Sequence, residues 1–325
     1  MKKAASCTVS VIITAYEAAS TVAGAVCTAL AETETAEVIV VDDASEDNTV
    51  AVAERAGQGD GRLTVLRCAL NGGPAAARNR ALEIAKGDFI AILDADDFIM
   101  PGRFGRLLSI SDADMIADNI LFVAENTNPH DIPSAPPISP RVIDIDLIGF
   151  VQANHSVRGS KRQEWGFLKP LIRRNFLESQ GLRYDESMRL GEDYDLYVRM
   201  LQKHARFRVS TEVGYAARWR YNSLSSRHST ADLQALHTAA LAHLSVDGMD
   251  GNTRAALSAH AKELRRRFLL RDFLDRRAQA GRIGALLSAC RDPLTLAPIA
   301  RGILSDKLAA YSSPPASRIG RLLIE

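Results

Sequence analysis

FIAILDADDF, residues Phe89 to Phe98, decides the fold, because a continuous apolar run ends there in three carboxylates. A short apolar run that stops at a turn signal is typical of a buried strand in a mostly parallel sheet. Sheets of this kind bind ligands beyond the carboxyl ends of their strands. We therefore expect Asp94, Asp96 and Asp97 to lie at the mouth of a site.

Carboxylates this close to one another repel strongly unless a cation or hydrogen bonds compensate their charge. Hard divalent ions such as Mg²⁺ and Mn²⁺ prefer oxygen ligands, and Mg²⁺ is usually held by one or two carboxylates together with substrate phosphates. The stretch is therefore a candidate metal site. The alternative is a solvated acidic turn that caps the following helix, and the residues of this stretch alone leave both interpretations open.

The flanking sequence alternates between strand-like and helix-like segments. The strand-like runs are 8–14, 37–41, 63–66, 89–93, 115–124 and 209–217. The expected helices begin near 20 and near 47, span 75–85, end at Gly181, span 191–203, and fill most of the chain from 231. The first four strands with their intervening helices predict βαβ units and a parallel sheet. The proline-rich segment 126–140 reads as a surface excursion.

Length and composition are those of an ordinary globular protein, with 325 residues, 46% hydrophobic and 24% charged. They allow one large domain or two moderate ones. The sequence has no apolar run long enough for a transmembrane helix, and its start lacks the separate apolar region and cleavage site of a signal peptide. Its four cysteines show no metal-type spacing, which fits a reducing compartment. We expect a cytoplasmic protein.

The net charge of +1 hides an uneven distribution. From Gly251 onward there are 14 Lys and Arg against 6 Asp and Glu, whereas the first 250 residues contain 26 against 33. A basic tail can bind nucleic acid or anionic lipid, and the absence of a nucleic-acid motif favours lipid. Around 262–277 the basic and apolar positions interleave, so an ordinary domain-packing helix is the alternative.

Several common nucleotide and catalytic motifs are absent from the sequence. No GxGxxG follows a strand, no GxxxxGK[ST] forms a phosphate loop, and no GxSxG forms a nucleophile elbow. The remaining features are acids at strand ends and one arginine-bearing helix.

Five motifs in this order resemble those of family 2 inverting glycosyltransferases with the GT-A fold: VSVIITAYEA, VIVVDDASEDNT, NGGPAAARNRAL, FIAILDADDF and LGEDYDLYVRM. The resemblance covers about Val9 to Ser226 and is greatest to bacterial exopolysaccharide glucosyltransferases of the succinoglycan type. It implies an α/β fold with a Rossmann-like, mostly parallel sheet flanked by helices and a helical C-terminal extension. The implied domains are a GT-A domain over 1–228, divided near 110 into nucleotide-binding and acceptor parts, and a helical, basic region over 229–325.

The resemblance also implies how a UDP-sugar is bound. It assigns Tyr16 and Asp43 to the uracil and ribose, Arg78 to closing over the nucleotide, and Asp94 to the ribose or a metal-bound water. The alternatives from the residues themselves are that Tyr16 packs on the sheet edge and that Asp42 or Asp43 caps the next helix. For Asp42 we prefer the cap. The family's usual Asn after the tyrosine is Glu17 here, which leaves open how that loop meets the nucleotide.

The family's DxD pair corresponds to Asp94 and Asp96, with Asp96 as the expected ligand of Mg²⁺ or Mn²⁺, and Asp97 could share that role. An inverting transferase needs a base that takes the proton of the acceptor hydroxyl, while the metal neutralises the departing diphosphate. The resemblance places this base at Asp193, with Glu192 binding the acceptor or holding the loop. The alternative for both is ordinary capping of a helix start.

The implied function is metal-dependent, inverting transfer of a sugar, expected to be glucose, from a UDP-sugar to a lipid-linked oligosaccharide in exopolysaccharide biosynthesis. The enzyme would work in the cytoplasm or peripherally on the inner face of the cytoplasmic membrane. Two weaker features are Arg220 to Ser226, which resembles the family's segment over the donor phosphates, and His228 as a candidate near them. A non-catalytic sugar- or lipid-binding protein on the same scaffold is the alternative.

Overall fold

The structure is a computed structural model that describes residues 7–132, 139–155, 164–219, 228–290, 295–296, 298–300 and 319–324. The chain divides into two compact units. The first contains residues 1–154, 161–220 and 318–325, and the second contains 155–160 and 221–317. The segment from Arg220 to Ser226, singled out above, lies outside the described residues.

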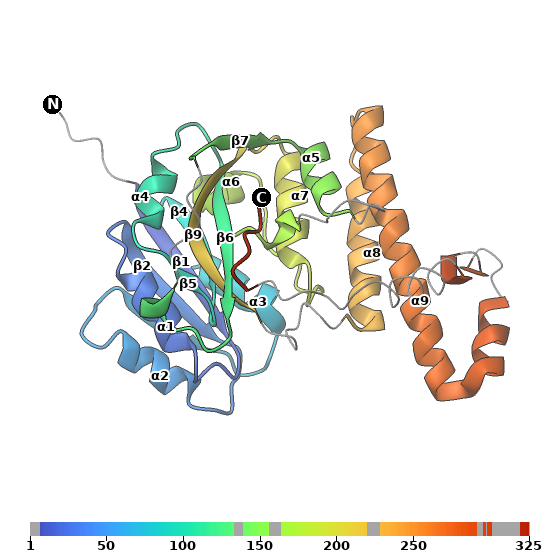
Figure 1. The fold of residues 1–325 in the computed structure, drawn as a ribbon, viewed down its shortest axis with the longest axis horizontal. Helices are drawn as coiled ribbons and strands as arrows, with labels where there is room; N and C mark the ends of the chain where they lie inside the picture. The colour runs from blue at the N-terminus through green and yellow to red at the C-terminus, as the bar shows by residue number, and fades with distance from the viewer. Residues whose placement is uncertain are drawn as a thin grey trace. The chain divides into compact units, whose positions relative to one another are not determined.

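One sheet in the order β3-β2-β1-β4-β8-β6-β9-β5, with β7 paired to β9, runs through the described part of the first unit (Figure 1). Its strands are β1 (Val9–Ala15), β2 (Thr35–Asp42), β3 (Leu63–Arg67), β4 (Phe89–Asp94), β5 (Phe98–Ile99), β6 (Met115–Ala124), β7 (Val142–Ile145), β8 (Leu171–Arg173) and β9 (Phe207–Trp219). The helices of this unit are α1 (Val22–Leu30), α2 (Thr49–Ala56), α3 (Gly73–Leu82), α4 (Arg103–Leu108), α5 (Leu147–Ala153), α6 (Arg174–Ser179) and α7 (Glu192–Gln202).

The first four strands are parallel, which confirms the predicted arrangement. β1 and β4 are buried almost throughout, as expected for a parallel sheet covered by helices on both faces. Thr14 of β1 lies opposite both Val41 of β2 and Asp94 of β4, so the strand ends that carry acids meet at one edge.

The second half of the sheet mixes directions. β8 runs antiparallel between β4 and β6, and β9 runs parallel to β6. The register of β6 and β9 shifts on both sides of Asn119, which marks a bulge. The short elements β5, β7, β8, α4 and α5 have no counterpart among the sequence expectations, because two to seven residues carry too little periodicity.

Residues 319–324 return to the first unit and lie beside β6, where Figure 1 shows them in red. Leu322 bridges to Leu121 in antiparallel fashion. The Asn119 side chain binds both backbone polar groups of Ile324: Nδ2 donates to the Ile324 carbonyl at 2.7 Å, and Oδ1 accepts from the Ile324 N–H at 2.8 Å. The sequence does not predict this return.

The second unit contains α8 (Thr230–Leu244) and α9 (Gly251–Cys290), which is interrupted at Gly281 with φ 72°. A capping box of Ser229 and Asp232 starts α8. The two helices pack through Ala240, Ala261 and Leu264. None of the described helices is long and apolar enough to cross a membrane.

Candidate active site

Asp94 at the end of β4, and Asp96 and Asp97 in the turn that follows, have different surroundings. The Asp97 N–H closes the turn on the Asp94 carbonyl at 3.0 Å. Asp97 is buried and points back into the protein, where Oδ2 accepts from the Tyr215 hydroxyl at 2.8 Å and Oδ1 from the Arg218 N–H at 2.9 Å. Asp96 is partly exposed on the same turn. Burial, with the charges of Asp96 and Asp94, holds the pKa of Asp97 well above its usual range.

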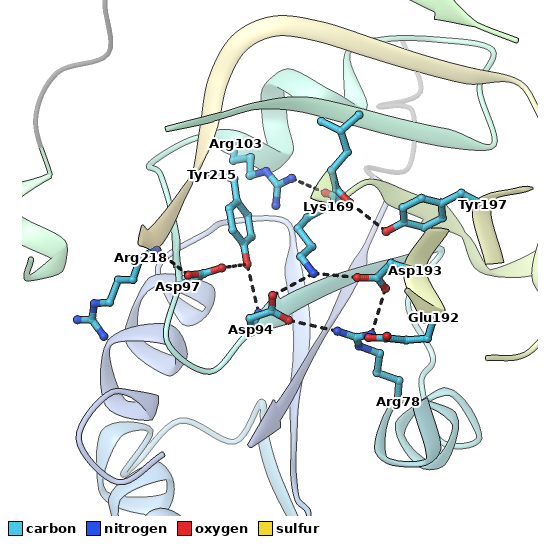
Figure 2. A network of polar contacts seen from close by, with 11 residues as sticks. Arg78, Asp94, Asp97, Arg103, Lys169, Glu192, Asp193, Tyr197, Tyr215 and Arg218 are labelled. Carbon is cyan, nitrogen blue, oxygen red and sulfur yellow. Dashed lines mark hydrogen bonds and ion pairs between the residues drawn. The ribbon is translucent and has the colours of Figure 1, made fainter. Parts of the chain in front are cut away.

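Asp94 and Asp193 are joined twice, through one arginine and one lysine (Figure 2). Arg78 contacts Oδ1 of Asp94 at 3.2 Å and Oδ1 of Asp193 at 3.1 Å. Lys169 Nζ contacts Oδ2 of Asp94 at 3.0 Å and Oδ2 of Asp193 at 2.9 Å. These four side chains therefore close a ring of alternating charge, which we call the four-residue ring.

The contacts of the four-residue ring, together with burial, shift the pKa values of Asp94 and of Glu192. Burial by itself would raise the pKa of Asp94, but Lys169 and then Arg78 bring the pKa below its ordinary value. Glu192 also binds Arg78 Nη1, yet burial dominates there and raises the pKa of Glu192. The guanidinium of Arg78 stacks over the Tyr184 ring with 5.2 Å to its centroid. Asp94 and Glu192 thus have pKa values shifted in opposite directions.

Arg78 reaches the acids of the four-residue ring because the start of α3, the helix that carries it, is fixed to the sheet. Both oxygens of Asp43 accept backbone N–H groups there, from Gly72 at 2.9 Å and from Gly73 at 2.8 Å. Gly73 has φ 84°, a conformation that favours glycine. The buried face of α3 then carries small alanines against β1 and β2, so its arginine lies close to the strand ends.

Lys169 is held at its backbone as well as at its amine. Its carbonyl accepts from Arg103 Nη2, and that guanidinium forms a buried pair with Asp118, 2.8 Å from Nη2 to Oδ1. Arg103 also lies over the Tyr215 ring, 5.1 Å from its centroid. The Tyr215 hydroxyl in turn accepts the Asp94 N–H at 3.2 Å. The bulged part of β6, through Asp118, and the facing part of β9, through Tyr215, therefore hold the backbone of Lys169 and of Asp94 in place.

The loops after β1 and β2 form the other side of the strand-end edge. Tyr16 is 55% exposed, so its ring is not packed into the core. Glu17 has φ 49°, its N–H donates to Ser45 Oγ, and its carboxylate accepts from the Glu46 N–H. The residue that departs from the family pattern therefore ties the two loops together.

The cap of α2 expected of Asp42 is wrong, and so is the same alternative for Asp43. Asp42 accepts from the Ser45 N–H at 3.2 Å, and the N–H at the start of α2 donates to Asp47 instead. Asp43 is turned to the start of α3 because Gly72 and Gly73 offer two unsatisfied N–H groups at that helix end. Oδ1 of Asp42 is buried with no hydrogen-bond partner among the described residues.

A divalent cation fits the turn after β4 only if a substrate supplies part of its coordination. Both oxygens of Asp94 are engaged by Arg78 and Lys169, and both of Asp97 by β9. Nowhere in the described part of the chain do three or more His, Cys, Asp or Glu converge to hold a metal. One hard oxygen ligand completed by a substrate diphosphate is a common way to bind Mg²⁺. Asp96, which is partly exposed on this turn, stays the predicted ligand.

Sequence reasoning missed Lys169, Tyr215, Arg103 and Asp118. The partners of Lys169 lie 24 and 75 positions away from it, so no local signal could have revealed its role. The predicted residues Arg78, Asp94, Glu192 and Asp193 do come together. His228 belongs to the second unit.

Comparison with known proteins finds a relative along almost the whole chain. Residues 10–155 match the family model described as glycosyl transferase family 2. The succinoglycan biosynthesis protein ExoU of Rhizobium meliloti is 48% identical over 97% of this chain and 93% of its own length.

Two solved structures share the fold. Staphylococcus aureus TarS 1–349 in complex with UDP-GlcNAc has a TM-score of 0.56 at 21% identity, covering 83% of this chain and 74% of that one. The mannosyltransferase PcManGT from Pyrobaculum calidifontis, in complex with GDP-Man and Mn²⁺, has a TM-score of 0.55 at 17% identity, covering 94% and 81%.

Proposed function

Because this chain belongs to glycosyl transferase family 2 and is a glycosyltransferase with the GT-A fold, we propose that it transfers a sugar from a UDP-sugar to a hydroxyl group with inversion. The sugar is expected to be glucose and the acceptor a lipid-linked oligosaccharide. Family membership favours this function over the non-catalytic alternative. The double link between Asp94 and Asp193 is the observation that carries the proposal.

The nucleotide is proposed to bind at the strand-end edge. Tyr16 offers an exposed aromatic face for the uracil. Each oxygen of Asp43 and Asp94 already has one partner, so these carboxylates would accept from the base and ribose through their remaining lone pairs. Arg78 supplies positive charge close to the diphosphate. UDP-GlcNAc bound to TarS, which has a similar fold, supports a UDP-sugar as the donor class.

Asp193 is the proposed general base and Glu192 the proposed acceptor-binding residue. Both stand in the first turn of α7, where Arg78 binds them together. Asp193 would take the proton of the acceptor hydroxyl while that oxygen attacks the anomeric carbon and UDP departs. The ion pairs of Asp193 with Arg78 and Lys169 fix the direction in which its carboxylate faces.

Asp96, with Asp94 beside it, would hold Mg²⁺ or Mn²⁺ together with the donor diphosphate. The ion would neutralise charge on the departing diphosphate. The oxygen-only chemistry of the turn after β4 supports a hard cation, and Mn²⁺ in PcManGT is consistent with it.

Exopolysaccharide biosynthesis is the proposed setting, supported by the likeness to a succinoglycan biosynthesis protein. The basic second unit is proposed to contact an anionic membrane surface, where a lipid-linked acceptor would be found. Arg271 and Arg276 are half-exposed on α9, but each pairs with an aspartate four positions away, so part of the positive charge is compensated. Leu274 is exposed between them.

Release of UDP by the purified protein tests the proposal. Among a panel of UDP-sugars, UDP-glucose should give the fastest release, and excess EDTA should abolish it. Asp193→Asn should keep UDP affinity and lower the rate by a factor of about 10² to 10⁴, the range for loss of acid-base catalysis. The exposed Asp185→Asn serves as the matched control. Full turnover by Asp193→Asn, or activity in EDTA, would contradict the base or the metal respectively.

A further inference from the structure

Lys169 is a buried cation that does not belong to any of the motifs quoted above, and only 8% of its side chain is exposed. It stands two residues before β8, the strand that lies between β4 and β6 in the sheet. A buried ammonium is costly unless it is paired, and Lys169 has two carboxylate partners, Asp94 at 3.0 Å and Asp193 at 2.9 Å. Because of these partners the pKa of Lys169 is raised despite its burial.

Lys169 compensates part of the negative charge gathered around it. Arg78 and Lys169 supply two positive charges to three carboxylates, those of Asp94, Glu192 and Asp193. Arg78 contacts all three acids, so it is shared. Lys169 contacts Asp94 and Asp193, in each case at Oδ2, whereas Arg78 contacts Oδ1 of both. Without Lys169, Asp193 would keep one ion pair and could rotate about it.

The backbone of Lys169 is fixed independently of its amine. Its carbonyl accepts from Arg103, whose guanidinium is locked by Asp118 in the interior. The adjacent Leu168 carbonyl accepts from the Tyr197 hydroxyl at 3.1 Å. These two anchors come from α4 and α7, and together they determine where the amine can reach.

We propose that Lys169 is a positioning residue that fixes the Asp193 carboxylate relative to the donor-side carboxylate Asp94. The inference rests on the proposed function, because it assumes that Asp193 acts in the chemical step. A base must lie within hydrogen-bond reach of the proton that it takes, and a displacement of about 1 Å can lower the rate about 10²-fold. Lys169 acts through Asp193 and touches no substrate in this role.

The experiment is a double-mutant cycle of Lys169→Met and Asp193→Asn. The probe is the UDP-sugar that gives the fastest UDP release, with water as acceptor, since hydrolysis needs the same base and no identified glycan. UDP affinity is measured by calorimetry and folding by thermal unfolding. Lys203→Met replaces an exposed lysine of the same unit and is the matched control. If Lys169→Met does not fold, Lys169→Gln, which keeps a hydrogen-bond donor, takes its place in the cycle.

Lys169→Met should lower kcat about 10²-fold in the wild-type background while the UDP dissociation constant stays close to that of the wild type. In the Asp193→Asn background the same change should have no further effect on kcat, to within about twofold. An equal loss of kcat in both backgrounds, or no loss in the wild type, would overturn the inference. Wild-type kcat in Asp193→Asn alone would instead overturn the proposed function.

Discussion

Replacing Gly214 by alanine should break the support behind the candidate active site. Gly214 belongs to β9 and lies against the buried pair of Arg103 and Asp118. A Cβ atom at this position would lie 1.8 Å from Oδ2 of Asp118 and 2.8 Å from Cγ of Arg103. Atoms in proteins do not approach this closely, so the Asp118 carboxylate must move away from the guanidinium.

The expected loss in the free energy of unfolding arises because displacing Asp118 leaves the buried Arg103 without its ion-pair partner. Nε and Nη2 of Arg103 both donate to Oδ1 of Asp118, at 3.0 and 2.8 Å, in an interior where both residues are almost fully buried. Overpacking alone costs about 1–3 kcal/mol. Separating a buried ion pair leaves charge uncompensated and costs about 3–5 kcal/mol. We expect Gly214→Ala to lower the free energy of unfolding by about 3–5 kcal/mol, because the two changes are one displacement and do not add.

Urea unfolding followed by tryptophan fluorescence measures this change. The two tryptophans, Trp165 and Trp219, both belong to the first unit, so their signal reports that unit. Gly61→Ala is the matched control, because a Cβ atom there would meet nothing within 4 Å. The control should stay within about 0.5 kcal/mol of the wild type. If Gly214→Ala also unfolds within about 1 kcal/mol of the wild type, the buried pair tolerates displacement and the reasoning is wrong.

Three further predictions concern other parts of the chain. Asn119→Ala removes both hydrogen bonds to Ile324 and should lower the free energy of unfolding by about 1–3 kcal/mol. The control Asn128→Ala, at an exposed position, should leave the free energy of unfolding unchanged. Equal urea midpoints for the two variants would contradict a role for the contact with Ile324. Hydrogen bonds from Thr8 lower the pKa of Asp88 in the folded state, so its contribution is present above the unfolded pKa of about 4 and is lost as the pH falls through the folded value. Asp88→Asn should therefore be less stable than the wild type at neutral pH and match it in strong acid, and a difference independent of pH would contradict this. Co-sedimentation with anionic but not zwitterionic vesicles, weakening as salt rises, is expected for the basic second unit, and recovery in the supernatant with both vesicle types at low salt would leave α9 as a packing helix.

Local patterns determined the parallel half of the sheet and the kind of residues at its edge. Strands β1, β2 and β4 are visible in the sequence because burial on both faces requires short, continuous apolar runs. The acids that follow β2 and β4 stand out because they interrupt those runs. Asp94 and Asp193 could be singled out as candidate site residues in the same way. Each has a carboxylate at the end of a strand or the start of a helix, and each belongs to a motif that resembles those of a known family.

The tertiary structure alone decided which charges meet and what holds them. Lys169 joins Asp94 and Asp193 across 75 and 24 positions, and Asn119 binds Ile324 across 205. Asp43 binds the start of α3 and not of α2, although α2 is nearer in sequence. The physical reason is that a buried polar group must find a partner wherever the packed chain offers one. That requirement selects partners by position in space, and the spacing of residues along the chain does not record it.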